Sequence, residues 1–154
     1  MRGGKPPHFI LRRNVMTWAE LKNQIRDLGF EDDYSMQEYE SIVRNAVNHA
    51  INTINYTVVL PLRAYFKAEL STDEEEWTVP VIKDITSDTP DDFEIQLPLM
   101  VQPLIKLLAS HYVWLDDDLT KATYYYNEYD DLMNQIKQAC YSTTRIVIGQ
   151  GLRL

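Results

Sequence analysis

The sequence predicts a mainly α fold: a small antiparallel bundle of about four helices, with a β-hairpin insertion and an extended C-terminal arm. Two observations lead to this prediction. Apolar residues recur at spacings of three and four over four stretches of chain, which is the period of an amphipathic helix. The 154 residues, 45% of them hydrophobic, suffice for one domain with its own core. We therefore divide the chain into a basic N-terminal arm (1–15), a helical domain (16–141, with the insertion at about 62–97) and a C-terminal arm (142–154).

The first helix is expected to begin at Trp18. Thr17 and Glu20 have the spacing of a capping box, in which each side chain satisfies a free backbone N–H of the other residue. Gly29 then supplies a residue that tolerates the left-handed conformation in which many helices end. The apolar stripe between these ends comprises Trp18, Leu21, Ile25 and Leu28.

A second, longer helix is expected after an acidic turn. Ser35 and Glu38 form a second capping-box pattern, so this helix should begin at Met36. It should end near residues 56–60, because a β-branched run there meets Pro61, which cannot continue a helix. Its apolar stripe comprises Tyr39, Ile42, Val43, Ala46, Val47, Ala50, Ile51 and Ile54.

The insertion at 62–97 has the composition of strands. Two partly apolar segments, Tyr65–Leu70 and Trp77–Val81, flank the polar turn Ser71–Asp73, which predicts a β-hairpin. Phe93–Leu97 alternates apolar and polar residues as a half-buried strand does.

The third and fourth helices form the second half of the predicted bundle. Pro98 and Pro103 confine the start of the third helix, because proline fits the first turn of a helix but not its interior. Its wide apolar face marks it as the most buried helix. Asp116–Asp118 ends it and places carboxylates at the free N–H groups of an antiparallel fourth helix, which runs to about Ala139. The two apolar faces comprise Leu104, Leu107, Leu108, Tyr112 and Leu115, then Ala122, Tyr126, Tyr129, Met133 and Ile136.

The C-terminal arm, residues 142–154, fits no helical period. The short apolar run Ile146–Ile148 is followed by two glycines, which loosen the chain. Such an extended segment needs a surface to lie against. Two interpretations stay open: the arm packs as an edge strand on the protein's own hairpin, or it pairs with a neighbouring chain.

The net charge of −8 and the pI near 4.8 argue against a protein that wraps nucleic acid over its whole surface. The first fifteen residues differ, since they hold four basic residues and no acid.

No stretch suits a membrane helix, and the N-terminus lacks the apolar core of a secretory signal, so we expect a soluble intracellular protein. Cys140 is the only cysteine, which predicts a buried thiol in a reducing compartment and no disulfide framework.

The common catalytic fingerprints are absent from the sequence: it has no phosphate-binding glycine loop, serine elbow, HExxH or paired CxxC. His8, His49 and His111 do not share a face, and the acidic clusters lack the spacing of a calcium loop. We predict no enzyme, no cofactor and no bound metal. Ten tyrosines and three tryptophans are many for one domain, and they favour a protein that binds other proteins.

Two segments follow a pattern found in one family of structural proteins. The first is LPLMVQPLIKLLASHYVWLDDD (97–118), which continues through Lys121 and Ala122 to Tyr126–Tyr129. The second is MTWAELK (16–22), which leads to DLGF (27–30). Over roughly residues 16–138 the chain resembles the head-tail connector (adaptor) proteins of long-tailed bacteriophages.

The resemblance implies a structural virion protein of the phage neck, between capsid and tail, assembled in the host cytoplasm. Such subunits form a ring, usually of twelve copies, beneath the portal and extend the DNA channel toward the tail. The implied partners are the portal protein, further neck or tail proteins and other copies of the chain, while DNA passes without specific binding and no membrane is involved. In this family the C-terminal segment commonly reaches the portal, here by strand addition and apolar burial. The residues concerned are Arg145, Ile146, Val147, Ile148, Leu152, Arg153 and Leu154.

Core and intersubunit contacts are expected at seven large side chains. These are Trp18, Leu104, Leu108, Tyr112, Trp114, Tyr126 and Tyr129.

Other functions stay open on the sequence alone. One is an adjacent neck layer, such as a head-completion, stopper or tail-joining protein. Others are a small acidic helical regulator that binds another protein, and an enzyme of unrecognised type. The basic arm (1–15) and the insertion (62–97) depart from the family pattern, and they leave the exact neck layer open.

Overall fold

The computed structural model describes residues 15–69 and 82–151, with side chains described for 15–67 and 82–142. Its four substantial helices confirm the mainly α prediction: α2 (Trp18–Gly29), α4 (Glu40–Ile54), α6 (Pro103–Trp114) and α7 (Leu119–Gly151). Shorter elements connect them. They are α3 (Asp33–Gln37), the π-helix η2 (Asn55–Val59), α5 (Arg63–Glu69) and the 3-10 helix η3 (Leu99–Val101).

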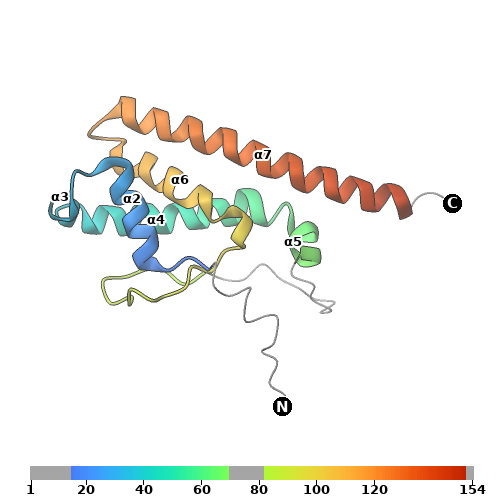
Figure 1. Cartoon of the computed structure of the whole chain (residues 1–154), viewed down its shortest axis with the longest axis horizontal. Helices are drawn as coiled ribbons and strands as arrows, with labels where there is room; N and C mark the ends of the chain where they lie inside the picture. The colour runs from blue at the N-terminus through green and yellow to red at the C-terminus, as the bar shows by residue number, and fades with distance from the viewer. Residues whose placement is uncertain (1–14, 70–81, 152–154) are drawn as a thin grey trace, which may run out of the picture.

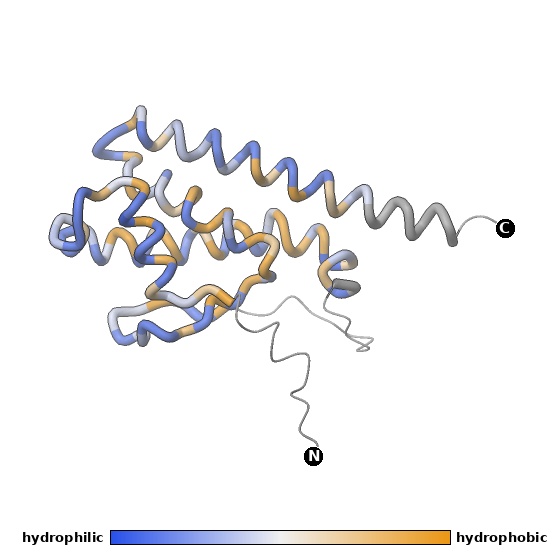
Figure 2. The backbone as a smooth tube through the Cα atoms, viewed as in Figure 1, coloured by the Kyte–Doolittle hydropathy of each residue, from blue (hydrophilic) through white to orange (hydrophobic). Residues whose placement is uncertain are grey.

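Helix α6 lies at the centre of the bundle, between α4 and α7, and it also contacts α2 (Figure 1). Leu104, Ile105 and Leu108 are at most 1% exposed, and Ala109 and Val113 are buried as well. Neighbouring positions such as 104 and 105 lie on different sides of a helix, so α6 is buried over most of its circumference. This confirms that the third predicted helix is the most buried one. Figure 2 shows the apolar residues gathered along α4 and α6.

The predicted start of α2 is confirmed, and Gly29 has a different role from the one expected. Thr17 N donates to Glu20 Oε2 at 3.0 Å, and Glu20 N donates to Thr17 Oγ1 at 3.2 Å, which completes the capping box. Gly29 ends the helix without adopting a left-handed conformation. It is required for space, because a Cβ atom there would lie 2.4 Å from Trp114 Nε1.

The predicted second capping box, from Ser35 to Glu38, is wrong. The cap is Asp32, whose Oδ1 accepts from Ser35 N at 2.8 Å, while Asp32 N donates back to Ser35 Oγ at 3.3 Å. Two overlapping capping patterns exist in this stretch, and the earlier one forms because aspartate and serine can satisfy each other's N–H groups. The result is the short helix α3, a turn, and a separate helix α4 that begins at Glu40.

Helix α4 continues into a π-helical turn before the chain reaches Pro61. Leu60 N donates to Asn55 O at 2.8 Å, the i to i+5 bond that defines this wider turn. The wider turn buries the consecutive residues Val58 and Val59 completely. The α-helix proper therefore ends at Ile54, close to the predicted position.

The predicted β-hairpin does not form in the described residues. Residues 65–69 of its first strand, Tyr65–Leu70, belong instead to α5, which places Phe66 fully in the core, and Leu70 lies outside the described residues. Alanine, lysine and glutamate within α5 favour a helix, and they outweigh the aromatic pair that suggested a strand. The turn Ser71–Asp73 and the second strand, Trp77–Val81, lie outside the described residues.

Phe93–Leu97 is extended, but it pairs with the chain at only one antiparallel bridge, between Thr17 and Glu94. Trp18 N donates to Phe93 O, and Ile95 N donates to Met16 O. The predicted alternation is present, since Ile95 and Leu97 are buried and Glu94 and Gln96 are exposed. No strand is assigned within residues 15–69 and 82–151, because this single bridge is too short to make a ladder.

Helix α7 begins as predicted, because Asp118 Oδ1 accepts from Lys121 N at 3.0 Å and caps it. Its buried stripe includes Tyr125 and Tyr129, whereas the predicted Tyr126 is 44% exposed. Cys140 is buried, as expected.

The extended C-terminal arm is wrong for residues 142–151, because α7 continues as a helix to Gly151. No proline interrupts Leu119–Gly151. Each residue added to an existing helix gains a backbone hydrogen bond without a new nucleation cost, so the run Ile146–Ile148 is carried into the helix despite its β-branched side chains. An edge strand on the protein's own hairpin is therefore excluded for this part, whereas contact with a neighbouring chain stays a prediction; residues 152–154 lie outside the described residues.

Candidate functional site

The seven side chains expected at core and intersubunit contacts separate into three groups. Trp18, Leu104, Leu108 and Tyr129 are between 0% and 4% exposed and belong to the subunit core. Tyr112 and Trp114 are partly buried against that core. Tyr126, at 44%, presents the largest surface of the seven.

Helix α7 is longer than the helices that pack against it, and its C-terminal end extends beyond them. Its 33 residues correspond to about 50 Å, against about 18 Å for the 12 residues of α6. Cys140 Sγ lies 3.9 Å from Met100 Sδ on the neighbouring chain segment, and Tyr141 beyond it is 51% exposed. The last turns of α7 extend past α5 (Figure 1). Arg145–Ile148, expected to dock on a partner, lie on these turns, and Leu152–Leu154 lie outside the described residues.

A groove of about 250 Å³ lies between α2 on one side and α3 with the start of α4 on the other; we call it the α2–α3 groove. Trp18 and Val43 form its floor, since they are 3% and 1% exposed. Asp33 and Glu40 stand at its rim with side chains 79% and 63% exposed. The other lining residues are Lys22, Asn23, Met36 and Gln37.

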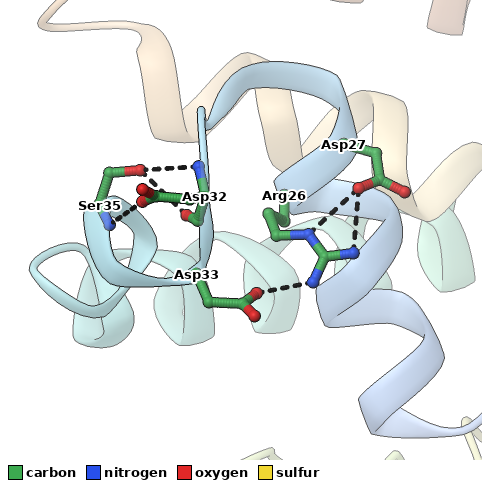
Figure 3. A network of polar contacts seen from close by, with 5 residues as sticks. All are labelled: Arg26, Asp27, Asp32, Asp33 and Ser35. Atoms are coloured by element: carbon green, nitrogen blue, oxygen red, sulfur yellow. Dashed lines mark hydrogen bonds and ion pairs between the residues drawn. The ribbon is translucent and has the colours of Figure 1, made fainter.

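Polar contacts hold α3 beside α2 (Figure 3). Arg26 reaches Asp33 at 2.6 Å and Asp27 at 3.1 Å, and the hydrogen bonds to these two carboxylates raise the pKa of Arg26. The hydrogen bonds from Ser35 lower the pKa of Asp32. No residue of α3 is buried, so these contacts and the cap, more than apolar packing, set its position.

An aromatic cluster of Phe30, Tyr39 and Trp114 closes the end of the bundle next to this groove. The ring centroid of Trp114 lies 4.9 Å from that of Phe30 and 5.9 Å from that of Tyr39. Lys121 Nζ lies 3.9 Å from the Trp114 ring centroid and donates to Gly29 O at 3.0 Å. The C-terminal end of α6 is therefore tied to α2 and α7 within one subunit.

The histidines make structural contacts where they are described. His111 Nδ1 lies 2.9 Å from Ala122 O, and the His49 ring packs on Tyr112 with centroids 4.5 Å apart. His8 lies outside the described residues. Within the described residues, no group of three His, Cys, Asp or Glu side chains is placed to hold a metal ion.

Two buried or half-buried amides were missed by sequence reasoning. Gln102 Nε2 donates to Leu97 O at 2.9 Å, and its Oε1 accepts from Met16 N at 3.3 Å. Asn48 forms a matched pair of hydrogen bonds with the backbone N–H and C=O of Ile85, at 2.8 and 2.9 Å. These amides form hydrogen bonds that hold the extended segments against the helices. The only sequence signal for such a role is an amide residue within an otherwise apolar helical stretch.

The outer face of α7 near its start is uncharged and partly apolar. Leu119 and Tyr124 are 66% and 59% exposed, and Thr120, Thr123 and Asn127 lie beside them in an open groove. No helix in the described part of the chain is long and apolar enough to cross a membrane.

Comparisons with known proteins found no matching family model, no similar curated protein and no similar solved structure.

Proposed function

We propose that this chain is a structural subunit of a bacteriophage neck, which forms a ring of twelve copies, joins the portal to the tail and extends the DNA channel. The resemblance of residues 16–138 to head-tail connector proteins carries the proposal. Its longest run, residues 97–129, folds into η3, α6, the acidic corner and the first third of α7. The resemblance thus falls on the helix pair around which the bundle is built.

The projecting end of α7 supports the proposed contact with the portal. Docking through this segment was expected to use an added strand, whereas residues 142–151 are helical. The contact is therefore proposed as a helix laid in a groove of the portal, which buries apolar side chains along one helix face. The candidates are the residues expected from the sequence, and because consecutive positions of a helix lie on different faces, only part of this set can make the contact: Arg145, Ile146, Val147, Ile148, Leu152, Arg153 and Leu154.

The charge of the helical body supports a channel that DNA passes without being held. Residues 15–140 hold nine basic and 23 acidic side chains, a net charge of −14. Phosphate is repelled by a wall of this sign, so DNA would slide through the ring without specific binding.

The test is electron microscopy of the chain mixed with the portal protein of the same phage. The full chain is compared with a chain truncated after Ser142, which keeps every residue whose side-chain contacts are described. A control chain carries Asp131→Asn, an exposed change on α7 far from its end. We expect a ring below the portal with the full and control chains, and none with the truncated one.

Each other outcome changes the proposal. A ring that survives truncation would retain the neck role and move the portal contact away from α7. No ring with the full chain would contradict the connector role and favour an adjacent neck layer or a regulatory protein. The thermal unfolding of the truncated chain, followed by circular dichroism, checks that its bundle is intact.

A further inference from the structure

Basic and acidic side chains are unevenly divided among the helices of this chain. Residues 41–67, which span η2 and most of α4 and α5, hold three basic side chains and no acid. The rest of residues 15–140 holds six basic and 23 acidic side chains, a net charge of −17. Copies of so acidic a body repel one another over most of their surface, so a second copy meets the least repulsion at the acid-free segment.

The turn that follows α4 presents an apolar and basic patch on this segment. We call Tyr56, Leu60 and Arg63 the π-turn patch. The π-helical turn buries the two valines within it and leaves Tyr56 and Leu60 67% and 38% exposed. Arg63 is exposed beside them, and its Nη1 donates to Leu60 O at 3.1 Å. Tyrosine and arginine are among the residues that contribute most to binding at protein interfaces.

The first half of α7 carries a surface of the complementary kind. Leu119 and Tyr124 are 66% and 59% exposed beside an open groove whose other lining residues are two threonines and an asparagine. Glu128 follows Tyr124 by four positions, so it lies on the same side of the helix, and it is exposed. We call these three residues and the groove the α7 surface. The groove suits the apolar side chains of the π-turn patch, and the carboxylate of Glu128 suits the guanidinium group of Arg63.

The charged groups of the two surfaces are available to a second copy. Among the residues whose side chains are described, neither Arg63 nor Glu128 forms an ion pair. Glu128 is turned about 100° around the helix axis from the buried Tyr129 that follows it, so it faces solvent and not the bundle. We propose that the π-turn patch of one copy binds the α7 surface of a second copy, with Arg63 paired to Glu128.

The positions of the two surfaces suit a ring. They share no residue, so the contact is heterologous, and repeating it gives a ring if the rotation closes and an open filament if it does not. The side chains of Thr57 and Tyr129 are hydrogen-bonded, which places the π-helical turn and Glu128 near the same level of the bundle. Surfaces at one level favour closure, because the contact adds little shift along the axis. The inference deepens the proposed function, on which it rests for the closed ring, while its first test needs only this chain.

The test is sedimentation velocity of the full chain over a series of concentrations. We expect oligomers that grow with concentration. Arg63→Glu should weaken this self-association about tenfold, because it sets two acids against each other. Lys83→Glu is the matched control, since Lys83 is exposed, lies outside both surfaces and undergoes the same change in charge. It should leave the self-association unchanged.

Glu128→Arg separates the proposed contact from general charge repulsion. This change reduces the net negative charge of the chain, so general repulsion predicts stronger self-association, whereas the proposed contact predicts weaker self-association. An equimolar mixture of the Arg63→Glu and Glu128→Arg chains should restore it, because the new glutamate of one variant meets the new arginine of the other. Mixing cannot restore a contact made within one copy. Circular dichroism checks that each variant folds.

The remaining outcomes overturn the contact or the neck role separately. The contact is overturned if the unmodified chain stays monomeric at every concentration, or if the mixture associates no better than its components. Self-association that neither substitution weakens would assign the π-turn patch to another partner, which also overturns the contact. Rings on the portal that form with the Arg63→Glu chain would refute this contact and keep the neck role. Self-association restored by mixing, without a ring on the portal, would refute only the neck role.

Discussion

At the scale of single residues, one close approach shows how a side chain distant in sequence decides the effect of a substitution. A Cβ atom on Gly29 would lie 2.4, 2.8 and 2.9 Å from three atoms of the Trp114 side chain. That ring cannot retreat freely, because Phe30 and Lys121 pack against it. The position looks like an ordinary helix end in the sequence, where alanine would be the better helix former.

We predict that Gly29→Ala destabilises the protein by about 1–3 kcal/mol, the usual cost of overpacking a filled site. Helix propensity alone would change stability in the other direction by about 1 kcal/mol, so the sign of the effect decides between the two. Urea unfolding followed by tryptophan fluorescence measures it. In a Trp114→Phe background the smaller ring should reduce the cost, and a stabilising Gly29→Ala would contradict the packing argument.

The buried amide of Gln102 leads to a second prediction. Gln102 is 3% exposed, and Gln102→Leu would leave Leu97 O and Met16 N without its hydrogen bonds. Unpaired buried polar groups cost about 1–3 kcal/mol each, so we expect a clear drop in the free energy of unfolding. Gln138→Leu, at an exposed position of α7, is the control and should stay within about 0.5 kcal/mol. Equal losses in both variants would contradict a specific role for Gln102.

At the scale of elements, α3 depends on a cap that responds to pH. Hydrogen bonds from Ser35 lower the pKa of Asp32 below its ordinary value of 3.8, because they favour the ionised carboxylate. A lowered pKa in the folded state means that the cap contributes fully above pH 3.8 and is lost as the pH falls through the folded value.

We therefore expect the chemical shift of the Ser35 amide, measured by NMR, to stay constant from pH 7 to pH 4. It should change only below the ordinary pKa of aspartate. Ser35→Ala removes the hydrogen bond from the hydroxyl and keeps the one from the backbone N–H, so it should move this transition to higher pH. A transition of the unmodified chain at or above pH 4 would show that the cap does not stabilise the carboxylate.

Prediction from the sequence succeeded for elements whose signals are local. The Thr17–Glu20 box, Pro103 and Asp118 set the starts of α2, α6 and α7 as expected, because each acts on backbone groups within one turn. Prediction failed where the signal was ambiguous. Tyr65–Leu70 has the composition of a strand, but its described residues, 65–69, follow a π-helical turn and fold as part of α5.

At the scale of the whole molecule, two surface features lie at opposite ends of the helical bundle. The α2–α3 groove and the aromatic cluster lie at one end, and the projecting turns of α7 lie at the other (Figure 1). The proposed contact of α7 with the portal therefore has a surface of its own, away from the groove and the aromatic cluster.

The sequence by itself determined the mainly α class, the order of the helices, the central position of α6 and the separation of charge between arm and body. These properties depend on periodicity, caps and composition, which act over a few residues or over the chain as a whole. Only the tertiary structure revealed the groove, the packing of Trp114 on Gly29 and the length by which α7 extends beyond the helices that pack against it. Each of these joins residues far apart in the chain, and no local pattern records which distant side chains will meet.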